Sequence, residues 1–195
     1  MEHRFYLGID LDDQYAVISS YELNKKEPET FSAIAGSEIY QIPALITKKK
    51  GIGQWFVGEE AVRLAIAQGE EANGRLLSRA VGGEKVFVDG ETYLEGKDCT
   101  PETFFQRMKA GAEISTSQPA PEPDRLVICM EKLSREATEL FLSMAPKLGI
   151  DREKLQLLDR KECFYYFAYH QVPELSMHDV YLFDYRREDI RCCRL

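Results

Sequence analysis

The run Leu126-Val127-Ile128-Cys129-Met130 is the feature that most constrains the fold. Its apolar residues do not alternate with polar ones, so the pattern indicates a strand that is buried on both faces. Strands of this kind lie in parallel sheets covered by helices. A helix is predicted to follow, because Ser134 can cap it and its apolar stripe continues to Leu148. Pro146 predicts a kink or an early end, and Gly149 supplies the stop.

Strands and helices also alternate along the rest of the chain. The acidic turn at residues 10–13 separates two β-rich runs, which predicts an N-terminal hairpin. The further elements that we expect are strands at residues 42–47 and 55–57, a helix at 59–68, a hairpin at 86–94, a helix from Thr100, a loop at 115–123, a strand at 155–158, an aromatic helix at 161–171 and strands at 180–184 and 190–195.

This order of elements predicts an α/β fold of the ribonuclease-H-like class. Three antiparallel strands come first, and helical crossovers then add strands to a mixed sheet flanked by helices. Residues 1–34 and 113–178 are expected to form this subdomain. Residues 35–112 are expected to form a smaller inserted α+β subdomain.

Several segments follow one another in an order typical of a known family. They are Gly8-Ile9-Asp10-Leu11, Ile42-Pro43-Ala44-Leu45-Ile46, Val57-Gly58-Glu59-Glu60-Ala61, Arg75-Leu76-Leu77-Ser78-Arg79, and residues 164–169 and 180–195. Together they resemble the first lobe of the seventy-kilodalton heat-shock chaperones, which are ATPases of the actin-like superfamily. The resemblance implies an actin-like ATPase fold with two phosphate loops. It also implies that residues 179–195 are the first hairpin of a second lobe, so we expect the chain to be part of a longer protein.

Both phosphate loops depart from the family pattern. Asp12, Asp13 and Gln14 stand where the family has glycine and hydroxyl side chains. A carboxylate facing a triphosphate costs about 1–4 kcal/mol of repulsion at contact distance, unless a divalent cation reverses the sign. The second loop, Asp184-Tyr185-Arg186-Arg187-Glu188-Asp189, lacks the three family glycines whose backbone amides wrap phosphate.

Two further family positions are altered. Gly74 occupies the place of the catalytic lysine, and Lys161 that of an acidic residue. We therefore expect a degenerate ATPase with no catalytic residues, which acts as a protein-interaction or regulatory module. The alternative is a protein whose altered loops still bind Mg-ATP once the second lobe is present. No cofactor is expected in this part of the protein.

Any nucleotide contacts are implied by the resemblance alone. The residues concerned are Asp10, Asp12, Asp13, Asp184, Arg186 and Arg187, of which Asp10 and Asp12 could also bind Mg²⁺. The competing interpretation of the aspartates is a hairpin turn whose carboxylates accept hydrogen bonds from nearby backbone amides. A nuclease of this fold class would also begin with a strand-end aspartate, but it would need further convergent carboxylates.

Charge and composition limit the classes of partner that the protein is expected to bind. Lys and Arg number 25 against 33 Asp and Glu, a net charge of −8, which argues against a nucleic-acid partner. No apolar run is long enough to cross a membrane. The expected partners are proteins and the missing second lobe, and the last hairpin could pair with a sheet edge or exchange with a second copy.

The cysteines, histidines and aromatic residues favour structural roles. The five cysteines include no Cys-x-x-Cys pair, which indicates reduced, buried thiols and a cytoplasmic location. His3, His170 and His178 have no partner at a spacing that would suit a nucleophilic triad. The aromatic residues Tyr165, Tyr166, Phe167 and Tyr169 are expected to pack in the core.

Overall fold

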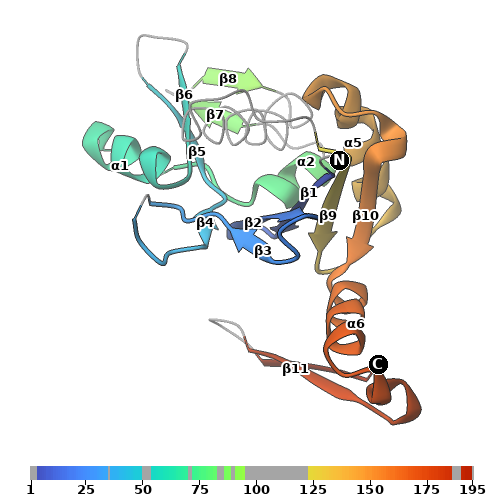
Figure 1. The fold of residues 1–195 in the computed structure, drawn as a ribbon. Coiled ribbons are helices and arrows are strands. Elements are labelled where there is room, and N and C mark those ends of the chain that lie inside the picture. The colour runs from blue at the N-terminus through green and yellow to red at the C-terminus, as the bar shows by residue number, and fades with distance from the viewer. Residues whose placement is uncertain are drawn as a thin grey trace.

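Strand β9 (Arg125–Met130) lies inside a mixed sheet, as its apolar sequence predicts (Figure 1). The computed structural model describes residues 4–34, 36–49, 54–69, 72–82, 86–88, 91–94, 123–185 and 190–194. The predicted helix from Thr100, nearly all of the loop at 115–123, and Arg186 and Arg187 lie outside these ranges.

The main sheet joins strands from both halves of the chain. Its order is β10-β9-β1-β2-β3, and β4 also pairs with β2. The bounds are β1 Phe5–Leu11, β2 Tyr15–Glu22, β3 Pro28–Thr30, β4 Ile42–Pro43 and β10 Leu155–Asp159. β1 is antiparallel to β2 and parallel to β9, and β9 is parallel to β10. The predicted N-terminal hairpin and the predicted α/β class with a mixed sheet are therefore confirmed.

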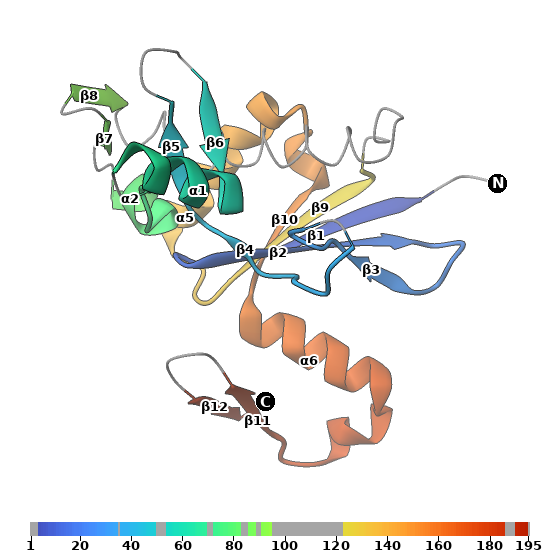
Figure 2. The ribbon, with the colours of Figure 1, turned by 90° about the vertical axis from the view of Figure 1, so that its left-hand side faces the viewer.

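Helices lie on both sides of this sheet. α5 (Arg135–Met144) lies on one side and α6 (Arg160–Gln171) on the other (Figure 2). Ser134 caps α5 by accepting a hydrogen bond from the Ala137 amide, as predicted. α5 ends before Pro146, in the 3₁₀ turn Ala145–Leu148, and Gly149 closes this turn with a φ of 71°. The early end that Pro146 predicts is confirmed.

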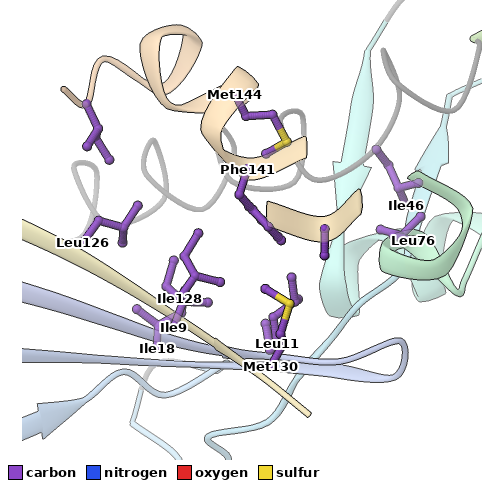
Figure 3. Close-up of a cluster of buried hydrophobic side chains, with 13 residues drawn as sticks. Ile9, Leu11, Ile18, Ile46, Leu76, Leu126, Ile128, Met130, Phe141 and Met144 are labelled. Atoms are coloured by element: carbon purple, nitrogen blue, oxygen red, sulfur yellow. The ribbon is translucent and has the colours of Figure 1, made fainter. Parts of the chain in front are cut away.

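The core forms where side chains of alternate strand residues meet α5 (Figure 3). Ile9 and Leu11 of β1 and Ile128 of β9 are buried on this face, together with Phe141 of α5, which is 1% exposed. Because strand side chains alternate between faces, Asp10 must point to the opposite face, the one on which α6 lies.

The middle of the chain forms smaller elements. They are β5 (Ile46–Lys48) paired with β6 (Trp55–Val57), α1 (Gly58–Gln68), α2 (Leu76–Gly82), and the hairpin of β7 (Val86–Val88) and β8 (Glu91–Leu94). The helix at 59–68 and the hairpin at 86–94 are confirmed, whereas α2 was not predicted as a helix.

The prediction of one strand at 42–47 is wrong. β4 pairs with β2, whereas β5 pairs with β6 in another sheet. Pro43 has no amide hydrogen, and its carbonyl accepts a hydrogen bond from the Leu45 amide at 2.8 Å. This tight turn ends the first strand and redirects the chain before Ile46.

The last two strands stand apart from the main sheet. β11 (Tyr181–Tyr185) and β12 (Ile190–Arg194) form a separate antiparallel pair, which α6 and the 3₁₀ turn Pro173–Met177 connect to β10. Arg191 of β12 forms an ion pair with Glu131, the residue after β9. This contact holds the hairpin at the carboxyl end of β9.

The prediction that the aromatic residues of α6 are core residues is wrong. Tyr165, Tyr166, Phe167 and Tyr169 are all exposed, and Arg160 is the one residue that α6 buries. The reason is that α6 contacts β9 and β10, while no element of the described ranges covers its aromatic side chains. No helix within those ranges is long and apolar enough to cross a membrane.

Candidate functional site

The ends of three parallel strands define the candidate site. β1, β9 and β10 run in the same direction, so their carboxyl ends meet at one edge of the sheet. The acidic turn after β1 lies at this edge, and Arg160 begins α6 directly after β10. Asp10 and Cys129 are register partners on neighbouring strands, which places their side chains beside each other on the α6 face.

Asp10 is bound by Arg160. Arg160 Nη2 donates to Asp10 Oδ1 at 2.6 Å, and Arg160 Nε donates to the same oxygen at 3.0 Å. The Arg160 side chain is 9% exposed and that of Asp10 is 42% exposed. The pair therefore lies at the boundary between the interior and solvent, with its positive partner on the inside.

The charge on Arg160 is maintained despite its burial. Burial alone would lower the pKa of Arg160, but the hydrogen bonds and negative charge of Asp10 outweigh it and raise the pKa. Asp12 adds a second negative charge, with its Oδ2 atom 3.6 Å from Arg160 Nη2. The guanidinium thus occupies the position next to Asp10 and Asp12 where a cation would have to bind both carboxylates.

Asp12 also binds the turn that it belongs to. Its Oδ1 atom accepts hydrogen bonds from the Gln14 and Tyr15 amides, each at 2.8 Å. This is the arrangement expected if the aspartates satisfy local backbone donors. Two amides of the first expected phosphate loop therefore already have a carboxylate as their acceptor.

Asp13 joins the turn to α2. Its Oδ1 atom accepts a hydrogen bond from the Ser78 amide at 2.8 Å, and its Oδ2 atom accepts one from the Ser78 hydroxyl. All three aspartates of the acidic turn consequently have partners within the protein.

The second expected phosphate loop is described only in part. Asp184 lies on β11, where its register partner is Arg191. Because Arg191 pairs with Glu131, this hairpin is held at the same edge of the sheet as Asp10.

Two thiols complete the site. Cys163 lies in the first turn of α6, three residues after Arg160, and so faces the side of the sheet on which Cys129 lies. A hydrogen bond between the two thiols and burial raise the pKa of Cys129, whereas the same hydrogen bond lowers the pKa of Cys163. Both cysteines are reduced, and Cys129 is the more buried of the two. Buried thiols were predicted for both residues; Cys129 confirms the prediction, whereas Cys163 is only half-buried.

The expected Mg²⁺ ligands are not assembled as a metal centre. Within the described part of the chain, no group of three or more histidine, cysteine or acidic side chains is arranged to hold a metal ion. The donor set that is present combines carboxylates with a bound guanidinium, which does not fit a divalent cation.

Sequence reasoning missed Arg160, Ser78 and the pairing of the two cysteines. Its position could have indicated Arg160, because it comes two residues after the strand predicted at 155–158, which runs parallel to β1. The cysteine pair carried a signal as well, because the alternation of β9 places Cys129 on the same face as Asp10. Ser78 carried none, since its contact depends on the position of α2.

Comparison with known proteins identifies the family of the chain. No protein of curated function matches the sequence. The family model for the C-terminal part of DUF5716, a family of unknown function, matches residues 27–195. This match includes Arg160, Cys129 and Cys163 and leaves out the acidic turn with Asp10. Since it covers most of the sequence, the chain belongs to the DUF5716 C-terminal family.

Proposed function

We propose that this chain is a ribonuclease-H-like lobe, related to the actin-like ATPases, that has lost ATP hydrolysis and acts through protein contacts. The sheet order supports the fold assignment. β1, β2 and β3 are antiparallel neighbours, and β9 and β10 extend the sheet in parallel on the other side of β1.

The main observation behind the proposed loss of activity is the bidentate contact of Arg160 with Asp10. In an ATPase of this type, the carboxylate near the end of the first strand would be needed near the metal and phosphates. Here its negative charge is already compensated by a side chain of the protein. Removing Arg160 from Asp10 would leave a nearly buried guanidinium without its main counter-charge, so a cation competes poorly for this position.

The first loop supports the same proposal. The amides of Gln14 and Tyr15 donate to Asp12, so a phosphate would have to displace a carboxylate that is covalently part of the same turn. Asp13 adds a further negative charge, which Ser78 holds beside this turn. These contacts oppose phosphate binding by geometry as well as by charge.

Exposed apolar side chains support a role in protein contacts. Aromatic residues are exposed on both α6 and β11, among them Tyr166, Phe167 and Tyr185. Large exposed apolar patches are typical of protein–protein contact sites. The partners that we propose are proteins or a further lobe of the same protein, with pairing at a hairpin edge as one mode of contact.

Isothermal titration of Mg-ATP into the protein tests the proposal. We expect no heat of binding at millimolar nucleotide for the natural sequence. Arg160→Gln should release Asp10, and Arg135→Gln is the matched control, because Arg135 forms an exposed pair with Glu139 on α5. Tight Mg-ATP binding that Asp10→Asn abolishes would overturn the proposal and favour the alternative of an Mg-ATP-binding protein.

A further inference from the structure

The candidate site holds two reduced cysteines that lie far apart in sequence and in contact in space. The side chain of Cys129 lies on the α6 face of β9, and Cys163 lies one turn after the start of α6. Cys129 is the register partner of Asp10, which Arg160 binds, and Cys163 lies three residues after Arg160 on the same face of α6. α6 contacts both β9 and β10, so the packing of this helix on the sheet brings the two sulfur atoms together.

We propose that Cys129 and Cys163 are a redox-active pair that a peroxide converts into a disulfide. This inference is independent of the proposed loss of ATP hydrolysis. It assigns a covalent modification to the site and names its co-reactant, hydrogen peroxide.

The two cysteines differ in the way that such a pair needs. Cys163 is half-buried and can be reached by a small oxidant, whereas Cys129 is buried beneath it. A hydrogen bond from Cys129 lowers the pKa of Cys163 despite burial and the negative charges of Asp10 and Glu162, and the Arg160 guanidinium acts in the same direction as this hydrogen bond. Cys163 is therefore the attacking sulfur, and Cys129 is positioned to resolve the product.

The reaction balances with peroxide as the oxidant. The Cys163 thiolate attacks one peroxide oxygen, the O–O bond breaks, and the departing hydroxide takes up a proton to become water. The sulfur of Cys129 then attacks that of the Cys163 sulfenic acid. The S–O bond breaks, and the thiol proton of Cys129 leaves with the hydroxyl group as a second water. Two thiols lose two electrons in total, and one peroxide becomes two waters.

The neighbouring cysteines of β12 provide an internal contrast. Cys192 and Cys193 are adjacent residues of one strand, so their side chains point to opposite faces. Cys192 is exposed, so an oxidant can reach it. Its thiol cannot pair with that of Cys193, because the two point to opposite faces of the strand. Selective formation of the pair Cys129–Cys163 would thus reflect geometry and not accessibility.

Peptide mapping after peroxide treatment tests the proposal on the natural sequence. The reduced protein is treated with a small excess of hydrogen peroxide, blocked with N-ethylmaleimide and digested without reductant. We expect a linked peptide that contains Cys129 and Cys163, lighter by two hydrogens than the sum of its parts, and reversal by dithiothreitol. Cys163 found as sulfinic acid while Cys129 is still a labelled thiol would overturn the proposal.

Variants separate the pair from the other thiols. The variant Cys99→Ser/Cys192→Ser/Cys193→Ser keeps Cys129 and Cys163 as its two cysteines and should still lose both labelled thiols with peroxide. Cys163→Ser in this background should leave Cys129 labelled at the same peroxide dose. If Cys129 loses its free thiol in the variant that lacks Cys163, the assigned roles are contradicted. Circular dichroism of each variant before treatment checks that it is folded, and the mapping of the natural sequence does not depend on any variant.

Discussion

Arg160 binds Asp10 across 150 residues of sequence, with its Nη2 atom 2.6 Å from Oδ1 of the carboxylate. The contact joins the first strand of the sheet to the first residue of α6. Because the aromatic side chains of that helix are exposed, this pair and the neighbouring cysteines help to hold the start of α6 to the sheet.

Asp10→Asn should destabilise the protein by about 1–3 kcal/mol, since it leaves the nearly buried guanidinium of Arg160 without its main counter-charge. Urea denaturation followed by circular dichroism measures this change in the free energy of unfolding. Glu139→Gln is the control, because it removes one member of the exposed pair with Arg135 and should have a much smaller effect. Equal effects of the two substitutions would show that Arg160 does not depend on Asp10.

Phe141→Ala should cost about 3–5 kcal/mol, because it opens a cavity in the core between α5 and the sheet. Phe141 is 1% exposed and Phe167 is 66% exposed, so the same substitution at Phe167 should change the free energy of unfolding by less than about 0.5 kcal/mol. Thermal and urea unfolding of both variants measure the difference. A large loss of stability in Phe167→Ala would mean that the aromatic side chains of α6 are packed against other residues.

Ser134→Ala should lower the stability by about 1 kcal/mol, because the Ala137 amide loses its acceptor at the start of α5. Ser143→Ala is a matched control on the same helix. The Ser143 hydroxyl donates to the Leu140 carbonyl from an exposed position and caps no helix start. Urea unfolding of the two variants is the measurement, and a loss at Ser143 as large as that at Ser134 would contradict the capping role.

Iodoacetamide should label Cys163 at lower pH than Cys129. The hydrogen bond from Cys129 lowers the pKa of Cys163, so the reactive thiolate of Cys163 is present at a pH where an ordinary cysteine is still protonated. The labelling rates, followed by mass spectrometry from about pH 6 to pH 9, give the two profiles. Cys129→Ala should move the Cys163 profile to higher pH, whereas Cys192→Ser should leave it unchanged. A Cys163 profile that Cys129→Ala does not move would contradict the hydrogen bond.

Oxidation of the pair Cys129–Cys163 should raise the free energy of unfolding by about 3–4 kcal/mol, because the disulfide would close a loop of some 35 residues in the unfolded chain. Urea unfolding with and without dithiothreitol measures the difference in the variant that keeps these two cysteines. The Cys163→Ser version should show no dependence on the reductant. A lower stability in the oxidised form would mean that the bond distorts the packing of α6 on β9.

The sequence predicts the sheet and the position of the last helix well, but it predicts the burial of that helix poorly, for physical reasons. The apolar run of β9 has one satisfactory environment, the inside of a covered sheet, and Pro146 restricts the backbone by covalent geometry. These signals are local. An aromatic helix such as α6 has the composition of a core element wherever it lies, and its exposure depends on what the rest of the fold places against it.

In the candidate site, too, the sequence indicates the local contacts but not those that depend on the whole fold. The acidic turn is visible in the sequence as a cluster of aspartates, and Asp12 binds amides two and three residues away. The partners of Asp10 and Asp13 come from α6 and α2, and only the folded topology brings them to the turn. A basic residue directly after a parallel strand was the one sequence signal that pointed to Arg160.

The position of β1 between β2 and β9 has a consequence for synthesis on the ribosome. The Phe5 amide at the start of β1 donates to Asp124, 119 residues later. At typical translation rates, that interval corresponds to roughly 6 to 24 s. During this time the N-terminal hairpin has one open edge, and Ile9 and Leu11 have no α5 to cover them. Nascent chains stalled before residue 125 should therefore be the form of this protein that chaperones bind most strongly.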